Sequence, residues 1–218
     1  MGDALLNING GDVTTLEIIV LLTLISLIPS ILIMTTSFAR IIIVLSIFRN
    51  ALGLQSAPPN MVLVSIALFL TLFIMGPVID EIHQDAYVPY TEQEITQIEA
   101  VMRAEIPLKE FMLKNTKGDS LDMFLEFAEM DEPENPLDLP MRIVIPSFMT
   151  SELSRAFVMG FLLYVPFLVI DVVVASTLMS MGMIMLPPVM ISMPFKLILF
   201  VLVDGWGLLT NQLVLSFL

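Results

Sequence analysis

The sequence lacks cysteine altogether and contains a single histidine, His83, among 218 residues. Disulfides, thiolate metal sites and cysteine nucleophiles are therefore excluded, and one imidazole cannot share a zinc ion with a second. Basic residues are also scarce, because Lys and Arg number nine against 22 acidic residues, for a net charge of −13. Nucleic-acid binding needs clustered basic residues. We expect no nucleic acid as a partner, no cofactor, no metal ligand and no catalytic residue, and hence no enzyme.

Apolar residues dominate instead, at 57% of the chain with a mean hydropathy of +0.92. That much apolar surface must be covered by lipid or by partner subunits. The charge is concentrated in residues 80–142, which carry 16 acidic and five basic side chains and so account for −11 of the net −13. We therefore divide the chain into an N-terminal apolar block over residues 1–79, an acidic insert over 80–142 and a C-terminal apolar block over 143–218.

Two stretches of the first block predict membrane-spanning helices, at about residues 18–39 and, after the helix-breaking pair Pro58-Pro59, at about 61–78. Arg40 and Arg49 lie between them, and the positive-inside rule places this connection in the cytoplasm and the acidic insert on the outer side. The two arginines either set this topology alone or are buried. If they are buried, each needs its own partner, because nine positions leave them on opposite sides of a helix.

The acidic insert predicts short amphipathic helices. The segment Thr91-Glu92-Gln93-Glu94 has the spacing of a capping box, and apolar residues follow it at helical intervals, at Ile95, Ile98, Met102 and Ile106. Pro107 is expected to open a second helix that stops at Gly118, and a third is expected over residues 121–130. We interpret the acidic side chains as a solvated exterior rather than a cation site, because the sequence has no calcium-loop pattern.

The second block predicts an apolar helical hairpin. Its centre, residues 179–193, contains six of the 17 methionines, and Gly182 with Pro187-Pro188 predicts a bend there. Asp171 and Lys196 are equidistant from the bend, so they would lie level and pair, within one hairpin or between copies. Alternatively, Lys196 reaches an interface while Asp171 faces a wet cavity.

A second ion pair is expected before the hairpin. Glu152 and Arg155 are spaced i,i+3 on a predicted helix, so we expect them to pair with each other.

Methionine is flexible and polarisable, so a ring of such bends from several subunits would seal a pore and still deform around a passing chain. Two other interpretations are open. Thioethers bind Cu(I), and Met-x-Met-x-Met can supply three of them, which favours a Cu(I) membrane transporter; the cysteine or histidine usual on such a route is missing. The methionines would otherwise serve helix packing, against which Gly182 and the two prolines argue.

Long motifs in both blocks carry a resemblance to a known family. They lie at residues 36–53 (TSFARIIIVLSIFRNALG), 55–60, 67–71, 151–153, 166–171, 175–188 (ASTLMSMGMIMLPP), 195–196 and 203–206. On these motifs the chain resembles the FliP family of flagellar biosynthetic proteins (FliP/SctR), over nearly its whole length and with an acidic insert in the same place.

The resemblance implies an all-α, membrane-associated subunit of an oligomeric pore, built of hydrophobic helical hairpins with a small acidic helical insert. It implies the export gate of the flagellar type III secretion system, as a multi-pass protein of the bacterial inner membrane and flagellar basal body. The implied partners are further copies of the chain, FliQ and FliR in the gate, FlhB, and unfolded rod, hook and filament subunits as secreted substrates. The assembled gate would lie largely above the bilayer, its apolar surface covered by partners.

The resemblance also assigns residues. It places the pore gasket at Met183, Ile184 and Met185, where the family more often has three methionines, and Ile184 is the stiffer, β-branched exception. Residues flanking the gasket in the methionine-rich bend are Met179, Met181, Pro187 and Pro188. The charged positions carried over are Asp171 and Lys196.

Overall fold

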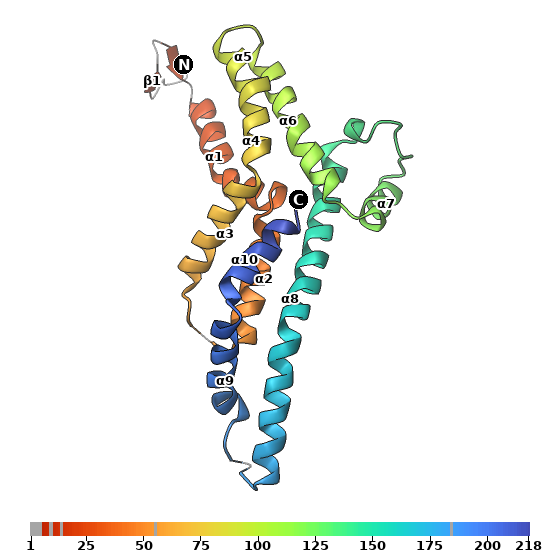
Figure 1. The fold of residues 1–218 in the computed structure, drawn as a ribbon. Coiled ribbons are helices and arrows are strands. Elements are labelled where there is room, and N and C mark those ends of the chain that lie inside the picture. The colour runs from red at the N-terminus through yellow and green to blue at the C-terminus, as the bar shows by residue number, and fades with distance from the viewer. Residues whose placement is uncertain (1–5, 9–10, 14, 55, 184) are drawn as a thin grey trace. The chain divides into compact units, whose positions relative to one another are not determined.

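The computed structural model describes residues 6–8, 11–13, 15–54, 56–183 and 185–218, and nearly all of its regular structure is helical (Figure 1). The all-α prediction is confirmed. The chain divides into two compact units, Met1–Met34 and Thr35–Leu218. The first contains an antiparallel ribbon of strands β1 (Leu6–Ile8) and β2 (Gly11–Val13), followed by helix α1 (Thr15–Thr35), which ends where the second unit begins.

The helix predicted over residues 18–39 is divided in two. α1 ends at Thr35, and α2 (Phe38–Ala51) begins at Phe38 with Ser37 as its N-cap. Three consecutive hydroxyl residues, 35–37, occupy the boundary, and such side chains compete with the helix for backbone groups. Thr36 shows this directly, because its hydroxyl accepts the backbone N–H of Phe38 at 3.4 Å.

The helix predicted over residues 61–78 is also interrupted. α3 (Asn60–Ile74) is followed by α4 (Gly76–Ile82), and the helical segment from Gly76 onward is bent by 56° from α3. Pro77 explains the break, because a residue without an N–H fits the first turn of a new helix but interrupts the interior of an existing one.

The acidic insert contains several short helical elements. They are the π-helical turn η1 (His83–Tyr87), α5 (Val88–Thr91), α6 (Gln97–Lys114), α7 (Gly118–Phe127) and the 3₁₀ turn η2 (Pro136–Asp138). The capping box forms at Thr96 and not, as the sequence pattern suggested, at Thr91. The Thr96 hydroxyl accepts the Glu99 N–H at 3.3 Å, and the Glu99 carboxylate accepts the Thr96 N–H at 2.8 Å.

Two neighbouring residues explain the shift of the capping box. Thr91 closes α5, where its hydroxyl donates to the Val88 carbonyl at 2.8 Å, and Gln93 then adopts a left-handed conformation with φ of 62°. The predictions for Pro107 and Gly118 are wrong too. Pro107 lies buried inside α6 rather than opening a helix, and Gly118 begins α7 rather than ending its predecessor. Packing of a buried residue offsets the single helical hydrogen bond that a proline removes.

The C-terminal block forms the predicted hairpin. α8 (Met141–Ser180) runs for 40 residues, about 60 Å at 1.5 Å per residue, and α9 (Pro188–Leu202) returns alongside it (Figure 1). After a left-handed Asp204 with φ of 49°, α10 (Gly205–Leu215) leaves α9 at a bend of 67°.

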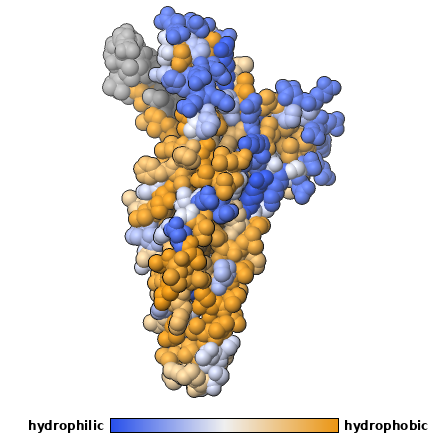
Figure 2. All heavy atoms as spheres, viewed as in Figure 1, coloured by the Kyte–Doolittle hydropathy of each residue, from blue (hydrophilic) through white to orange (hydrophobic). Residues whose placement is uncertain are grey.

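α8 holds two hydrophobic clusters of the second unit together. One cluster gathers buried residues of α2, α3, α8, α9 and α10, and the other gathers those of α6, α7 and the start of α8. α2 approaches α8 closely at Gly160, where any Cβ would collide with the side chain of Ile47. Figure 2 shows hydrophilic residues over the insert and a largely hydrophobic surface over the α8–α9 hairpin.

Among the described residues, α8 is the one helix long and apolar enough to cross a membrane unaided. Three further pairs of helices meet the same test if each bent pair counts as one span, which gives up to four. Four is also the number of spans that the sequence predicts, two in each apolar block. In the structure α8 is continuous, and each of the other three candidate spans is a bent pair of helices.

The capping box generates a test. We expect Thr96→Ala to speed amide hydrogen exchange in the first turn of α6 by about fivefold, because the N-cap side chain is lost. Hydrogen exchange with mass spectrometry on the detergent-solubilised chain measures it. Thr91→Ala is the matched control and leaves this turn unchanged; equal effects at both positions would contradict the assignment.

Acid should weaken the same turn. The hydrogen bonds that the Glu99 carboxylate accepts from the backbone N–H and then the hydroxyl of Thr96 hold its pKa below the usual value. A depressed folded-state pKa means that the stabilisation is present above the unfolded pKa and is lost as the pH falls through the folded one. The protection of this turn, measured as the ratio of the intrinsic to the observed exchange rate, should therefore fall on acidification in the wild type and depend less on pH in Glu99→Gln.

Candidate functional site

The methionine-rich bend is built by a glycine and two prolines. At the end of α8 the N–H of Met183 donates to the Leu178 carbonyl at 2.9 Å, and the N–H of Gly182 donates to the Met179 carbonyl at 3.0 Å. This paired closure requires a positive φ, which Gly182 supplies at 76° without steric cost. α9 then starts at Pro188, in a first turn where the missing N–H would have no partner.

The methionine side chains of the bend are exposed on the surface of the chain. Met185 is 98% exposed, and Met183, Met181 and Met179 are all exposed as well. Ile184, the third predicted gasket residue, lies outside the described residues. Flexible apolar side chains thus form the tip of the hairpin, and the chain itself does not cover them.

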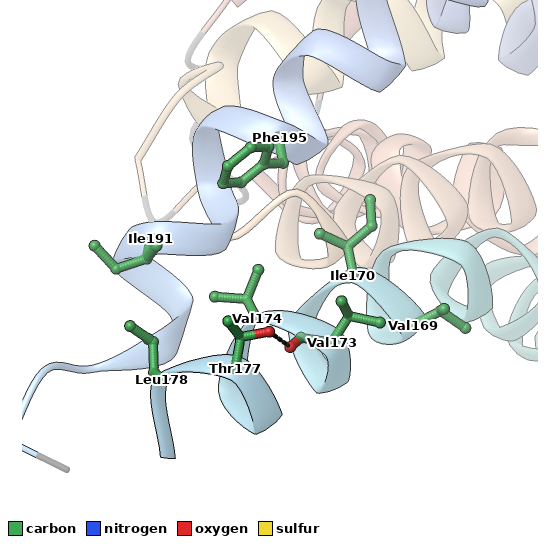
Figure 3. Close-up of a pocket in the computed structure, with 8 residues that line it drawn as sticks. All are labelled: Val169, Ile170, Val173, Val174, Thr177, Leu178, Ile191 and Phe195. Atoms are coloured by element: carbon green, nitrogen blue, oxygen red, sulfur yellow. Dashed lines mark hydrogen bonds between the residues drawn. The ribbon is translucent and has the colours of Figure 1, made fainter. Parts of the chain in front are cut away.

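An apolar groove of about 500 Å³ lies beside the bend, between α8 and α9 (Figure 3). Its walls include Val173, Val174 and Leu178 from α8 and Ile191 and Phe195 from α9. The hydroxyl of Thr177 in this wall already donates to the Val173 carbonyl at 2.8 Å. The groove therefore suits hydrocarbon rather than a polar ligand.

The structure brings Asp171 and Lys196 together within one hairpin. The Lys196 ammonium lies 2.7 Å from the Asp171 carboxylate and also donates to the Ala51 carbonyl at 2.9 Å. The Ser192 hydroxyl donates to the other Asp171 oxygen at 2.5 Å. Lys196 is buried and Asp171 is 21% exposed, so the group ties α8 and α9 to the end of α2.

Glu152 pairs with Arg40 of α2, so the expected Glu152–Arg155 pair is wrong. Both Arg40 and Glu152 are fully buried and joined by two parallel hydrogen bonds, one of them from Arg40 Nε at 2.9 Å. Arg155 is only half-buried on the same helix as Glu152. A planar guanidinium on the facing helix offers the buried carboxylate two donors at once, which a neighbour at i+3 does not.

The Arg40 guanidinium also binds residues at the C-terminal end of the chain. Its terminal nitrogen donates to the Ser216 carbonyl at 2.8 Å and to the Ser216 hydroxyl at 2.9 Å. The Phe217 ring centroid lies 3.7 Å from the guanidinium carbon. A cation at a helix C-terminus also interacts favourably with the helix dipole, so Arg40 fixes the end of α10.

Arg49 is only partly buried and contacts different partners from Arg40, as expected from the 180° separation of the two side chains around the helix. It donates to the Pro58 carbonyl at 3.3 Å and to the Asn60 side chain at 2.5 Å. It thereby holds the connection between α2 and α3.

Sequence reasoning missed Ser192 and Ser216. Ser192 lies four residues before Lys196, on the same helical face, so the spacing could have identified it. Ser216 lies 176 residues from Arg40 and carries no local signal. Within the described part of the chain, no three His, Asp or Glu residues lie close enough together to hold a metal ion.

Known proteins resemble this chain along most of its length. The FliP family model matches residues 21–213. The flagellar biosynthetic protein FliP of Bacillus subtilis is 52% identical over 204 residues, covering 94% of this chain and 92% of the relative. Those of Aquifex aeolicus (95% of this chain, 88% of the relative) and Treponema pallidum (94% and 76%) are each 50% identical.

We expect Arg40→Ala or Glu152→Ala to destabilise the chain by about 3–5 kcal/mol, because each leaves a buried charge without its partner. Thermal unfolding in detergent, across a double-mutant cycle, should give a strong coupling between the two. The matched cycle uses Arg155→Ala with Glu152→Ala, and here the coupling should be small. A larger coupling in the second cycle would reverse the assignment. Arg40→Lys should not rescue, since an ammonium lacks the planar fork.

The Asp171 group predicts a second cycle. Asp171→Ala should destabilise the chain by about 3 kcal/mol, because the Lys196 ammonium is left buried and unpaired, and adding Lys196→Met should recover part of the loss. Ser192→Ala, which keeps both charges, should cost about 1 kcal/mol. The same unfolding measurement decides, and strictly additive losses in the double variant would mean that the two charges do not interact.

Proposed function

Since the chain belongs to the FliP family of flagellar biosynthetic proteins, we propose that it is a core subunit of the flagellar type III export gate. Its relatives are named for flagellar biosynthesis. The methionine-rich bend is the observation that supports a more specific role, which is to line and seal the channel through which unfolded rod, hook and filament subunits leave the cell.

The bend suits a seal that must also open. Its exposed thioether side chains present no strong hydrogen-bonding group, so a narrow ring of them would exclude water and ions. Unbranched methionine side chains adopt many rotamers, so the same ring would fit around polypeptides of different shape. The apolar groove beside the bend offers water few hydrogen-bonding partners. Met183, Ile184 and Met185 are the proposed gasket, flanked by Met179, Met181, Pro187 and Pro188.

One chain cannot form such a ring, so the protein is proposed to act as a homo-oligomer. Large apolar side chains remain exposed on α3, at Phe69 and Phe73, and on α8, at Phe157 and Phe161. Apolar surface on this scale marks contact with lipid or protein. We assign it to neighbouring copies, to FliQ and FliR, to FlhB and to the lipid of the inner membrane, in a multi-pass protein of the flagellar basal body.

The proposed role is passive conduction, without catalysis. The buried charged groups hold helices together: Arg40 and Glu152 join α2 to α8, and Asp171 and Lys196 join the two arms of the hairpin. Family membership favours protein export over Cu(I) transport, the other use of clustered thioethers.

The gasket is tested by changing Met183, Ile184 and Met185 together to Gly. We expect the variant to assemble but to let small ions leak, so that cells expressing it lose membrane potential, measured with a potential-sensitive dye. Changing the same three residues to Leu is the matched control: apolar bulk is retained and the leak should be much smaller. A normal membrane potential in a Gly variant that has assembled, as native gel electrophoresis reports, would mean that this segment is not the seal.

A further inference from the structure

The bend concentrates oxidisable sulfur at the surface. Five exposed methionines lie within 12 residues of one another, and their side chains are 62%, 66%, 40%, 98% and 68% exposed at Met179, Met181, Met183, Met185 and Met190. By contrast, Met75 and Met112 in the interior are 3% and 0% exposed. Because the chain has no cysteine, thioethers are its only sulfur groups.

Exposed thioethers react with peroxides. The methionine sulfur takes one oxygen atom from hydrogen peroxide and is oxidised by two electrons to the sulfoxide, while the O–O bond breaks and the remaining oxygen leaves as water. The reaction needs access to the sulfur, which the interior methionines lack. It is reversed by methionine sulfoxide reductases, so it can act as a switch rather than only as damage.

Oxidation of these methionines would change the polarity of an otherwise apolar region. A sulfoxide is polar and accepts hydrogen bonds strongly, whereas the groove next to the bend is lined by Val, Leu, Ile and Phe side chains (Figure 3). The hydroxyl of Thr177 in that wall is already donated to Val173. A new sulfoxide oxygen at the bend would therefore be satisfied by water, which hydrates a surface that excludes water only while it is apolar.

We propose that the methionine-rich bend is a site of reversible oxidation by peroxide, and that sulfoxide formation there wets the seal and lets ions pass. The location of the oxidation follows from the exposure of these side chains on the single chain. The consequence for conductance rests on the proposed function of the bend as a gasket. Met185, the most exposed of the five, is the expected first target.

The chemistry is tested on the purified assembled protein in liposomes, treated with limiting hydrogen peroxide and analysed by peptide mass spectrometry. We expect each bend methionine to gain one oxygen atom several-fold faster than Met75 and Met112, with Met185 leading. Oxidation of the bend no faster than that of Met112 would overturn the proposal.

The consequence is tested by ion flux through the same liposomes before and after peroxide. Flux should rise several-fold on oxidation and return after treatment with methionine sulfoxide reductases. A variant in which the five methionines are changed to Leu should show no rise over its own untreated baseline. Met102→Leu is the control, because Met102 is an exposed methionine of α6, at the other end of α8 from the bend; this variant should respond to peroxide as the wild type does.

The outcomes separate the two proposals. If the bend is oxidised without a rise in flux while the variant with Gly at 183–185 leaks, the gasket stands and the oxidation switch is wrong. If the Gly variant is also tight, the gasket is wrong and the switch fails with it.

Discussion

The buried pair of Arg40 and Glu152 constrains the rest of the second unit. Two charges removed from water cost several kcal/mol each unless their hydrogen-bonding groups are satisfied in a fixed geometry. Here the carboxylate receives two guanidinium bonds, and the remaining guanidinium nitrogen binds the end of α10 at Ser216. Any shift of α2, α8 or α10 relative to the others would leave one of these groups unpaired, so one side chain fixes the relative positions of three helices.

A second pair of charged side chains fixes helix positions nearer the bend. Asp171 and Lys196 set the register of α9 against α8, and the Ala51 carbonyl ties both to the end of α2. The hairpin is therefore held by paired charges in its stem, while its tip consists of exposed side chains with many rotamers. A stem that cannot slide and a tip that can deform are the mechanical properties expected of a channel seal that must stay in position while its opening changes shape.

The distribution of polar and apolar groups is the reverse of that in a soluble monomer. Arg40 of α2 and Glu152 of α8 are buried and paired, whereas long runs of hydrocarbon on α3, α8 and α9 face outward. The acidic residues gather on the insert, where they are solvated (Figure 2). Exposed apolar surface on this scale marks contact with lipid or with partner subunits, which is consistent with the proposed role in a multi-subunit gate.

The sequence alone determined the features that near neighbours control. Gly182 and the two prolines placed the bend because they restrict the backbone locally, and the equal distance of Asp171 and Lys196 from that bend made them candidates for a pair, which the structure forms within one hairpin. A separation of nine positions was enough to show that Arg40 and Arg49, if buried, need different partners. The long motifs likewise indicated the family.

The tertiary structure decided the features that depend on which faces of the helices are buried together. It matched Glu152 with an arginine 112 residues away rather than with Arg155, moved the capping box from Thr91 to Thr96, and carried α6 through Pro107. Local spacing offered Glu152 only Arg155, whereas folding buries Glu152 against Arg40, where the energy of a polar contact is larger. For the capping box, the end of α5 at Thr91 and the left-handed Gln93 left Thr96 as the start of α6.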